Sequence, residues 1–199
     1  MNQNAKVLVF ALAGWSGFFV MAVELLSGRI LAPTFGNSIY VWGAVITIFM
    51  LALAVGYLLG GQFSVHSPSL RRLGLLLIAA GIATLPVVLF GTAALDAIFD
   101  RVDDPRYGSL IASALLFFVP TAISGAVSPY AVRLVVSNLH ASGRSAGSLY
   151  FVSTFGSAAG TLVTSFYLVL LFEVNAILLG LMAISLALGL LAVVVRGDR

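Results

Sequence analysis

Apolar residues run along the chain in long blocks that are interrupted by short clusters of charged, glycine and proline residues. Six blocks are long enough to cross a membrane, for which roughly 20 apolar residues are needed. We expect helical spans at residues 7–31, 39–63, 73–95, 110–132, 149–171 and 177–195. The pattern predicts an all-α polytopic membrane protein whose residues 1–199 form one six-helix transmembrane domain.

The amino-acid composition supports this prediction and excludes several classes of function. Of the 199 residues, 61% are hydrophobic and 9% are charged, whereas an ordinary soluble domain has about 25% charged residues. Six spans leave no room for a soluble catalytic domain of ~100 residues. The chain has no cysteine, which excludes disulfides and thiolate metal sites. Hydrolase, phosphate-loop and dinucleotide-binding motifs are absent, so we expect no enzyme, cofactor or metal site.

The distribution of basic residues predicts the orientation. With six spans both termini lie on one side, and seven basic residues fall on that side against three on the other. Because short cytoplasmic loops carry an excess of Lys and Arg, we expect both termini in the cytoplasm and the protein in the cell (inner) membrane. The partner of this basic chain is then the lipid bilayer and not nucleic acid. The seven residues are Lys6, Arg71, Arg72, Arg133, Arg144, Arg196 and Arg199, and the three are Arg29, Arg101 and Arg106.

The longest outer connection, residues 96–108, is acidic. It holds four aspartates and two arginines, which gives a local net charge of −4 + 2 = −2. An acidic mouth over a helical bundle would concentrate cations. The alternative is a solvated loop whose charges only follow the topology.

Two ionisable residues, Glu24 and Arg29, fall inside the first predicted span. A charge at the centre of a span costs at least ~2.5–3.5 kcal/mol, so such residues need a reason. Glu24 lies ~26 Å along the helix from Val7, near the predicted outer boundary. Two interpretations stay open: a structural ion pair of Glu24 with Arg29 or a neighbouring helix, and a carboxylate that contacts a substrate or ion.

Small residues recur every four positions on two spans, at Gly56 and Gly60 and again at Gly156 and Gly160. This spacing lets helix backbones approach closely in lipid. Both pairs fall in the cytoplasmic halves of the predicted spans, which favours direct packing at that depth over an inverted internal repeat. Hydroxyl side chains nearby either bond their own helix carbonyls or line a polar track: Ser153, Thr154, Ser157, Thr161, Thr164 and Ser165.

Prolines and histidines complete the candidate chemistry. Pro120 and Pro129 bracket Ser128 in the fourth span, and Pro86 lies within the third. Because proline removes a backbone donor, we expect a kinked fourth helix, either simply bent or acting as a moving or binding element. His66 and His140 have no second ligand at metal spacing and are interpreted as loop residues.

The stretches 24–38, 42–61, 125–134 and 147–160 together resemble the membrane region of the fused major-facilitator/spermidine-synthase-like proteins. The carrying segments include Glu24-Leu25-Leu26-Ser27-Gly28-Arg29, Gly56-Tyr57-Leu58-Leu59-Gly60-Gly61 and Gly125-Ala126-Val127-Ser128-Pro129-Tyr130. The resemblance implies a six-helix, half major-facilitator-like bundle. In that family the bundle is usually joined to a cytoplasmic aminopropyltransferase-like domain that uses decarboxylated S-adenosylmethionine.

This sequence departs from the family in three places. It ends at Arg199, so we expect no synthase domain and no spermidine synthesis. It has no acidic residue near Gly60, which puts a gating ion pair in doubt, and it has Glu173 where the family often has a small residue. With these departures, the candidate substrate-binding residues are Glu24, Arg29, Tyr57, Ser128, Pro129 and Arg133.

Two hypotheses of different classes follow. The first is a transport-like protein in which two six-helix chains form a homodimer that moves or binds a small cationic or amphipathic, polyamine-related solute. The second is a non-transporting membrane anchor for a separately encoded aminopropyltransferase, with a docking face at Arg71, Arg72 and residues 140–144. A third alternative is a helical fragment that binds a hydrophobic ligand.

Overall fold

A computed structural model describes residues 3–65, 67–136 and 142–195. These residues form helices and short connections without a strand. Six helical segments are long and apolar enough to cross a membrane, which confirms the predicted fold class. The helices are α1 (Gln3–Phe35), α2 (Ile39–Phe63), α3 (Leu70–Phe99), α4 (Pro105–Val135), α5 (Ser142–Val163), the π-helical turn η2 (Thr164–Leu168), α6 (Val169–Leu171) and α7 (Val174–Val194).

Most helices are longer than the apolar blocks that predicted them. The second span has the predicted limits, whereas α1 begins at Gln3 and ends at Phe35, and α4 extends from Pro105 to Val135. Side-chain caps set several of these ends: Ser38, Ser69 and Asp104 each accept a hydrogen bond from a backbone N–H of the following helix. Such caps satisfy donors that the helix itself leaves free.

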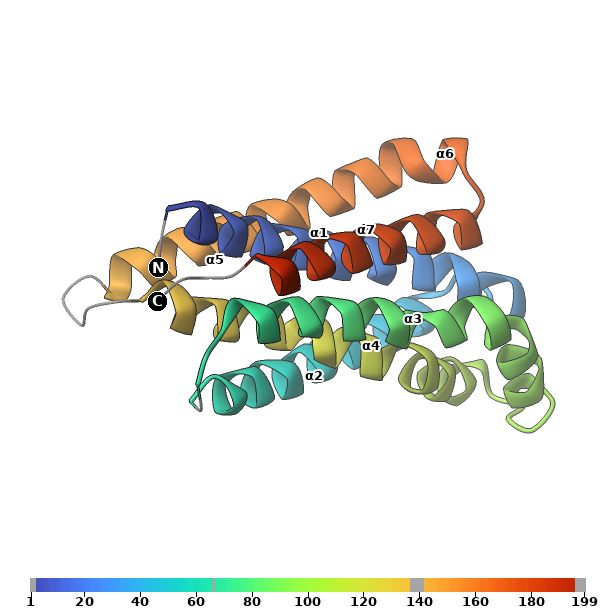
Figure 1. The fold of residues 1–199 in the computed structure, drawn as a ribbon. Coiled ribbons are helices and arrows are strands. Elements are labelled where there is room, and N and C mark those ends of the chain that lie inside the picture. The colour runs from blue at the N-terminus through green and yellow to red at the C-terminus, as the bar shows by residue number, and fades with distance from the viewer. Residues whose placement is uncertain (1–2, 66, 137–141, 196–199) are drawn as a thin grey trace.

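The spans alternate in direction, and the described chain begins and ends at the same end of the bundle (Figure 1). At this end α2 and α4 finish and α3 and α5 begin, whereas the connections from α1 to α2, from α3 to α4 and from α6 to α7 lie at the other end. An even number of crossings produces this arrangement.

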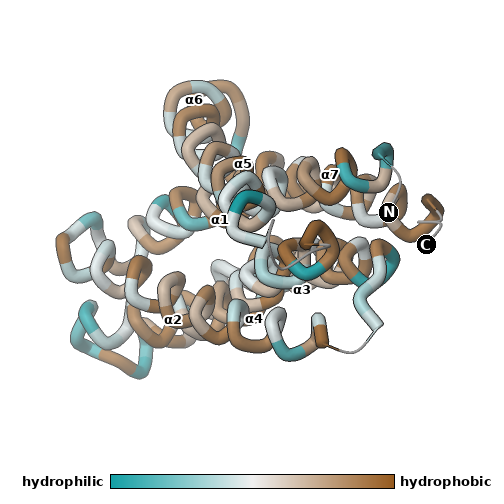
Figure 2. The backbone as a smooth tube through the Cα atoms, turned by 90° about the vertical axis from the view of Figure 1, so that its left-hand side faces the viewer, coloured by the Kyte–Doolittle hydropathy of each residue, from teal (hydrophilic) through white to brown (hydrophobic). Residues whose placement is uncertain are grey.

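Seen along the helices, the bundle has two layers (Figure 2). One layer contains α1, α5 and α7, and the other contains α2, α3 and α4. The closest partnerships are α2 with α4, α1 with α5, and α3 with α7. Large apolar side chains such as Phe49, Phe117 and Leu26 are buried in the core, while many others, including Phe151 and Leu170, remain exposed on the outside. A surface of that kind suits surrounding hydrocarbon.

The irregular span is the fifth, not the fourth. Although α4 contains Pro120 and Pro129, it continues from Pro105 to Val135 without interruption. The fifth span instead changes to a π-helical turn at Thr164–Leu168 before the short α6. The two prolines of the fourth span therefore lie inside one continuous helix, and the turn that departs from α-helical geometry lies in the fifth span.

Candidate functional site

The glycines of α2 bring this helix against α4. A methyl group added to Gly56 would collide with the backbone of Ala122, and one added to Gly60 would lie 2.6 Å from the Ala126 Cα. No side chain can relieve a collision with backbone, so only glycine permits this separation. The close approach fixes the face that α2 presents to the bundle interior.

The glycines of α5 make the corresponding contact with α1. A Cβ at Gly156 would lie 2.8 Å from the carbonyl carbon of Gly14, and one at Gly160 would lie 2.8 Å from the Phe18 Cα. The two glycine pairs therefore do not pack against each other. Each pair contacts a different helix of the bundle.

These contacts define an internal two-fold relation between the first three spans and the last three. Ser16 and Ser124 are 108 residues apart, and the same separation relates Gly14 to Ala122 and Phe18 to Ala126. In this relation α4 is the counterpart of α1 and α5 is the counterpart of α2. The contact of α2 with α4 therefore corresponds to the contact of α5 with α1. Because each half has three spans, the second half enters the bundle from the opposite side, which is an inverted repeat. The close helix packing expected at both glycine pairs is present, and it occurs together with this relation between the halves, which the sequence did not favour.

A small polar cavity lies where the two halves meet. It has a volume of about 70 Å³ and is lined by α1, α2, α4 and α5. A water needs about 10–15 Å³ of such space, so the cavity accommodates a few waters or one small polar group. Its lining residues are Ser16, Gly17, Val20, Met21, Leu53, Tyr57, Ser124, Gly125, Ser128, Ser153 and Ser157.

Hydroxyl groups supply the polar atoms of this serine cavity. The Ser16 hydroxyl donates to the carbonyl oxygen of Ser124, its counterpart in the other half, at 3.0 Å. The hydroxyls of Ser128 and Ser153 lie 3.1 Å apart and bond each other across α4 and α5. Ser157 donates to its own helix at the Ser153 carbonyl. A pair of hydroxyls has one donor and several lone pairs left over, which can bind an amine, a hydroxyl or water.

Two of the predicted site residues, Tyr57 and Ser128, line this cavity. Tyr57 lines the serine cavity from α2 and is 50% exposed, so its hydroxyl can reach a molecule outside the bundle. Ser128 lines the same cavity. The structure therefore brings Tyr57 and Ser128 together, although they lie on different spans.

Glu24 lies on the same helical stripe as the cavity residues of α1. It follows Gly17 by seven residues, which is nearly two full turns. Among the described residues its carboxylate has neither an ion-pair partner nor a hydrogen-bond partner, and Arg29 does not pair with it. α1 continues for eleven residues beyond Glu24, to Phe35, a further roughly 16 Å along the helix.

Arg29 has a different environment. Its Nη1 donates to the Val169 carbonyl oxygen at 3.2 Å, close to the end of α6 at Leu171. A cation near a helix C-terminus satisfies free carbonyls and complements the helix dipole. Arg29 thus ties α1 to the irregular fifth span.

Pro129 and Arg133 line another cavity, of about 440 Å³, between the ends of α2, α4 and α5. Ser64 and Ser142 contribute to its wall. Four of the six predicted site residues therefore divide between two cavities, and Glu24 and Arg29 line neither of them. The predicted docking face lies at this same end of the bundle, where Arg71 and Arg72 begin α3 and Arg144 lies in α5. His140, which belongs to that face, and His66 lie outside the described residues.

The connection between α3 and α4, which was predicted to be the longest outer one, contains an ion pair. Arg106 Nη2 lies 2.6 Å from Asp104 Oδ2, and the Arg106 guanidinium lies 5.7 Å from the centre of the Tyr40 ring. Hydrogen bonds from the Arg106 side chain and backbone lower the pKa of the Asp104 carboxyl. Within the described ranges no three His, Asp or Glu side chains gather to hold a metal.

Sequence reasoning named Ser153 and Ser157 as residues that could line a polar track, but it did not place Ser16 or Ser124 in a site. Ser16 and Ser124 gave no signal because isolated serines are common in spans, and only the constant separation of Ser-Gly pairs in the first and fourth spans could have marked them. No protein-family model matches this chain, and neither the curated proteins nor the solved structures contain a match to it.

Proposed function

We propose that this protein is a six-helix half of a transport-like membrane protein, and that two copies enclose a site for a small cationic solute. The observation that carries the proposal is the serine cavity where the two halves meet, with Tyr57 in its wall. Glu24 lies on the same stripe of α1 and has no ion-pair partner among the described residues. In carriers built from inverted repeats, substrate sites lie near the membrane midplane at the interface of the repeats. The resemblance to the major-facilitator/spermidine-synthase-like membrane region supports the same architecture.

The unequal burial of the spans supports a second copy as the partner. In the fifth span only 11% of the most apolar window is buried, against 39% or more in each other span. One of the site residues, Ser153, lies on this thinly covered span itself. The others lie on α1, α2 and α4: Glu24, Tyr57 and Ser128. A carboxylate facing lipid inside a span is costly, so this face requires a protein or water-filled cover.

A homodimer also specifies the charge of the solute. Two parallel copies that meet through this face contribute one Glu24 each to a shared space. The resulting pair of carboxylates complements a compact organic dication such as a polyamine, whose amines the cavity hydroxyls can bind. We place the protein in the cell membrane with both termini cytoplasmic, because the basic residues Lys6, Arg71 and Arg72 lie at the end of the bundle where the chain begins and ends.

Uptake into proteoliposomes tests this function. Purified protein is reconstituted, and accumulation of radiolabelled putrescine, spermidine and a lipophilic cation is measured with and without a pH gradient and a membrane potential. We expect uptake of at least one cation above protein-free vesicles, and a loss of most of it in Glu24→Gln. Glu173→Gln is the matched control, since Glu173 is an exposed carboxylate before α7, and it is expected to retain uptake.

The readouts separate the parts of the proposal. Native mass spectrometry of the same preparation gives the oligomeric state, and a monomer that transports would refute the homodimer. A folded dimer that moves none of these cations would refute the carrier. If that dimer instead copurifies with a soluble aminopropyltransferase-like enzyme, the anchoring hypothesis is supported.

A further inference from the structure

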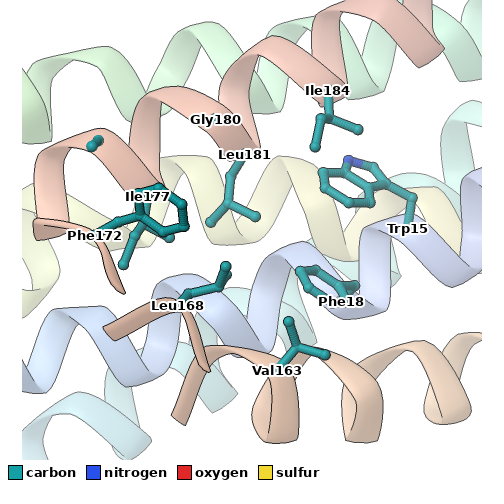
Figure 3. Close-up of a pocket in the computed structure, with 10 residues that line it drawn as sticks. Trp15, Phe18, Val163, Leu168, Phe172, Ile177, Gly180, Leu181 and Ile184 are labelled. Atoms are coloured by element: carbon teal, nitrogen blue, oxygen red, sulfur yellow. The ribbon is translucent and has the colours of Figure 1, made fainter. Parts of the chain in front are cut away.

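A second cavity, an apolar crevice, opens between α1, the fifth span and α7. It has a volume of about 350 Å³, within the range of sites that bind small molecules. Figure 3 shows its wall: Trp15 and Phe18 project from α1, Leu168 from η2, and Ile177 and Leu181 from α7. Unlike the serine cavity, it is lined by hydrocarbon side chains.

The π-helical turn and one glycine explain why the crevice is open. α5 is held on α1 by its glycine contacts, but beyond them the fifth span turns at Thr164–Leu168 and diverges from α7 (Figure 1). On the facing side of α7, Gly180 has no side chain, and a Cβ there would meet nothing within 4 Å. No protein segment among the described residues fills the space that remains.

The single polar group in the wall is already satisfied. The indole N–H of Trp15 donates to the Ser185 hydroxyl at 2.8 Å, and its ring stacks on Phe18 with centroids 5.3 Å apart. The floor of the crevice is therefore an aromatic surface without a free donor. Such a surface favours an alkyl chain over a polar solute.

A cation lies at the outer end of the crevice. Arg29 follows Phe18 by eleven residues, close to three helical turns, so both lie on one face of α1 with a rise of roughly 16 Å between them. Arg29 binds Val169, which adjoins the crevice residue Leu168. A guanidinium has five donors, and this exposed one has no ion-pair partner among the described residues.

From this juxtaposition we infer that the crevice binds an anionic phospholipid, with one acyl chain against Trp15 and Phe18 and the phosphate at Arg29. The crevice lies among membrane spans, so acyl chains are the molecules that surround it. The rise from Phe18 to Arg29 matches the hydrocarbon depth of one leaflet, about 15 Å. The remaining guanidinium donors suit phosphate oxygens. This inference is independent of the proposed transport function.

Fluorescence quenching by brominated lipids tests the site. The chain has two tryptophans, and Trp42→Phe leaves Trp15 as the only emitter. The variant is placed in phosphatidylcholine nanodiscs that contain an equal minor fraction of phosphatidylglycerol or phosphatidylcholine brominated in the acyl chain. One basic residue near the surface gives about a five-fold preference for anionic lipid, so we expect markedly stronger quenching by brominated phosphatidylglycerol.

Three further variants distinguish the parts of the site. Arg29→Gln is expected to abolish the preference, and Arg29→Lys to retain most of it. Gly180→Leu, which fills the crevice, is expected to reduce quenching by both lipids. Gly43→Leu is the matched control, because a Cβ on this exposed glycine of α2 also meets nothing within 4 Å, and it is expected to leave quenching unchanged.

Several outcomes would overturn the inference. Equal quenching by the two lipids would show contact with bulk acyl chains and no bound anion, and a preference that survives Arg29→Gln would place the anion elsewhere. Abolition of the preference by added inorganic phosphate would indicate a simple anion site. Native mass spectrometry of the unsubstituted protein with both lipids gives the same comparison if Trp42→Phe does not fold, and failure to retain phosphatidylglycerol preferentially would refute the site.

Discussion

The substitution Gly156→Ala tests the helix contact on which the fifth span depends. A Cβ at this position would lie 2.8 Å from the carbonyl carbon and 3.0 Å from the Cα of Gly14, whereas carbon atoms are at their best separation near ~3.5–4.0 Å. Both obstacles are backbone atoms, so α1 and α5 must separate. Since few other contacts hold this span, we expect the separation to be felt in the stability of the whole bundle.

The magnitude follows from two opposing terms. Overpacking costs typically about 1–3 kcal/mol, and a collision with backbone belongs at the upper end of that range. Replacing glycine by alanine within a helix returns up to about 1 kcal/mol through helix propensity. The free energy of unfolding should therefore fall by about 2 kcal/mol.

Gly147→Ala on the same helix is the matched control, because a Cβ at Gly147 meets nothing within 4 Å. There only the propensity gain operates, and we expect an increase of up to about 1 kcal/mol. Unfolding by titration with dodecyl sulfate in mixed micelles, followed by far-ultraviolet circular dichroism, measures both variants. Equal stability of Gly156→Ala and the unsubstituted protein, or an equal loss in Gly147→Ala, would refute the close contact.

Two further predictions concern the outer connection and the serine cavity. Because Arg106 lowers the pKa of Asp104 from its usual 3.8, the stabilisation by this pair is present above pH 3.8 and disappears as the pH falls through the lower folded-state value. The melting midpoint should therefore drop in acid less steeply in Asp104→Asn than in the unsubstituted protein, and parallel slopes would contradict the pairing. In the natural cysteine-free background, Ser128→Cys with Ser153→Cys should form a disulfide on mild oxidation, since the two hydroxyls lie 3.1 Å apart. Thr154→Cys with Ser128→Cys should not crosslink, and electrophoretic mobility with and without reductant reports both results.

The limits of the helices show what hydropathy can and cannot fix. The apolar blocks located all six spans, because in hydrocarbon each backbone polar group must be bonded within a helix. They did not locate the ends, since helices continue into polar sequence while their hydrogen bonds and caps persist. α1 accordingly includes Asn4 and Lys6, and α4 begins at Pro105, after the Asp104 cap.

The prolines and the π-helical turn also show that local sequence does not by itself locate irregular helix geometry. Proline was a visible signal in the fourth span, yet α4 remains continuous past Pro120 and Pro129. The turn at Thr164–Leu168 contains neither glycine nor proline, so local sequence gave no warning of it. The segments on either side of the π-helical turn are held in place because α5 packs on α1 and α7 packs on α3. The turn joins these two differently placed segments.

The candidate site was only partly visible in the sequence. Glu24 could be identified because a carboxylate in a span is rare, and Tyr57 and Ser128 through the family resemblance. Their assembly with Ser16 and Ser153 required four helices to converge. The separate place of Arg133 and the attachment of Arg29 to Val169 likewise depend on neighbours that are distant in the chain.

By itself, the sequence determined that this chain is a bundle of six membrane-spanning helices and that glycines spaced four apart form close helix contacts. Both conclusions depend on local properties, namely transfer free energy along a segment and the absence of a side chain at a position. Only the tertiary structure decided that Gly56 meets α4, that Gly156 meets α1, and that the halves are related as an inverted repeat. The partner of a helix face is chosen by the fit of all six helices together, and no single segment contains that information.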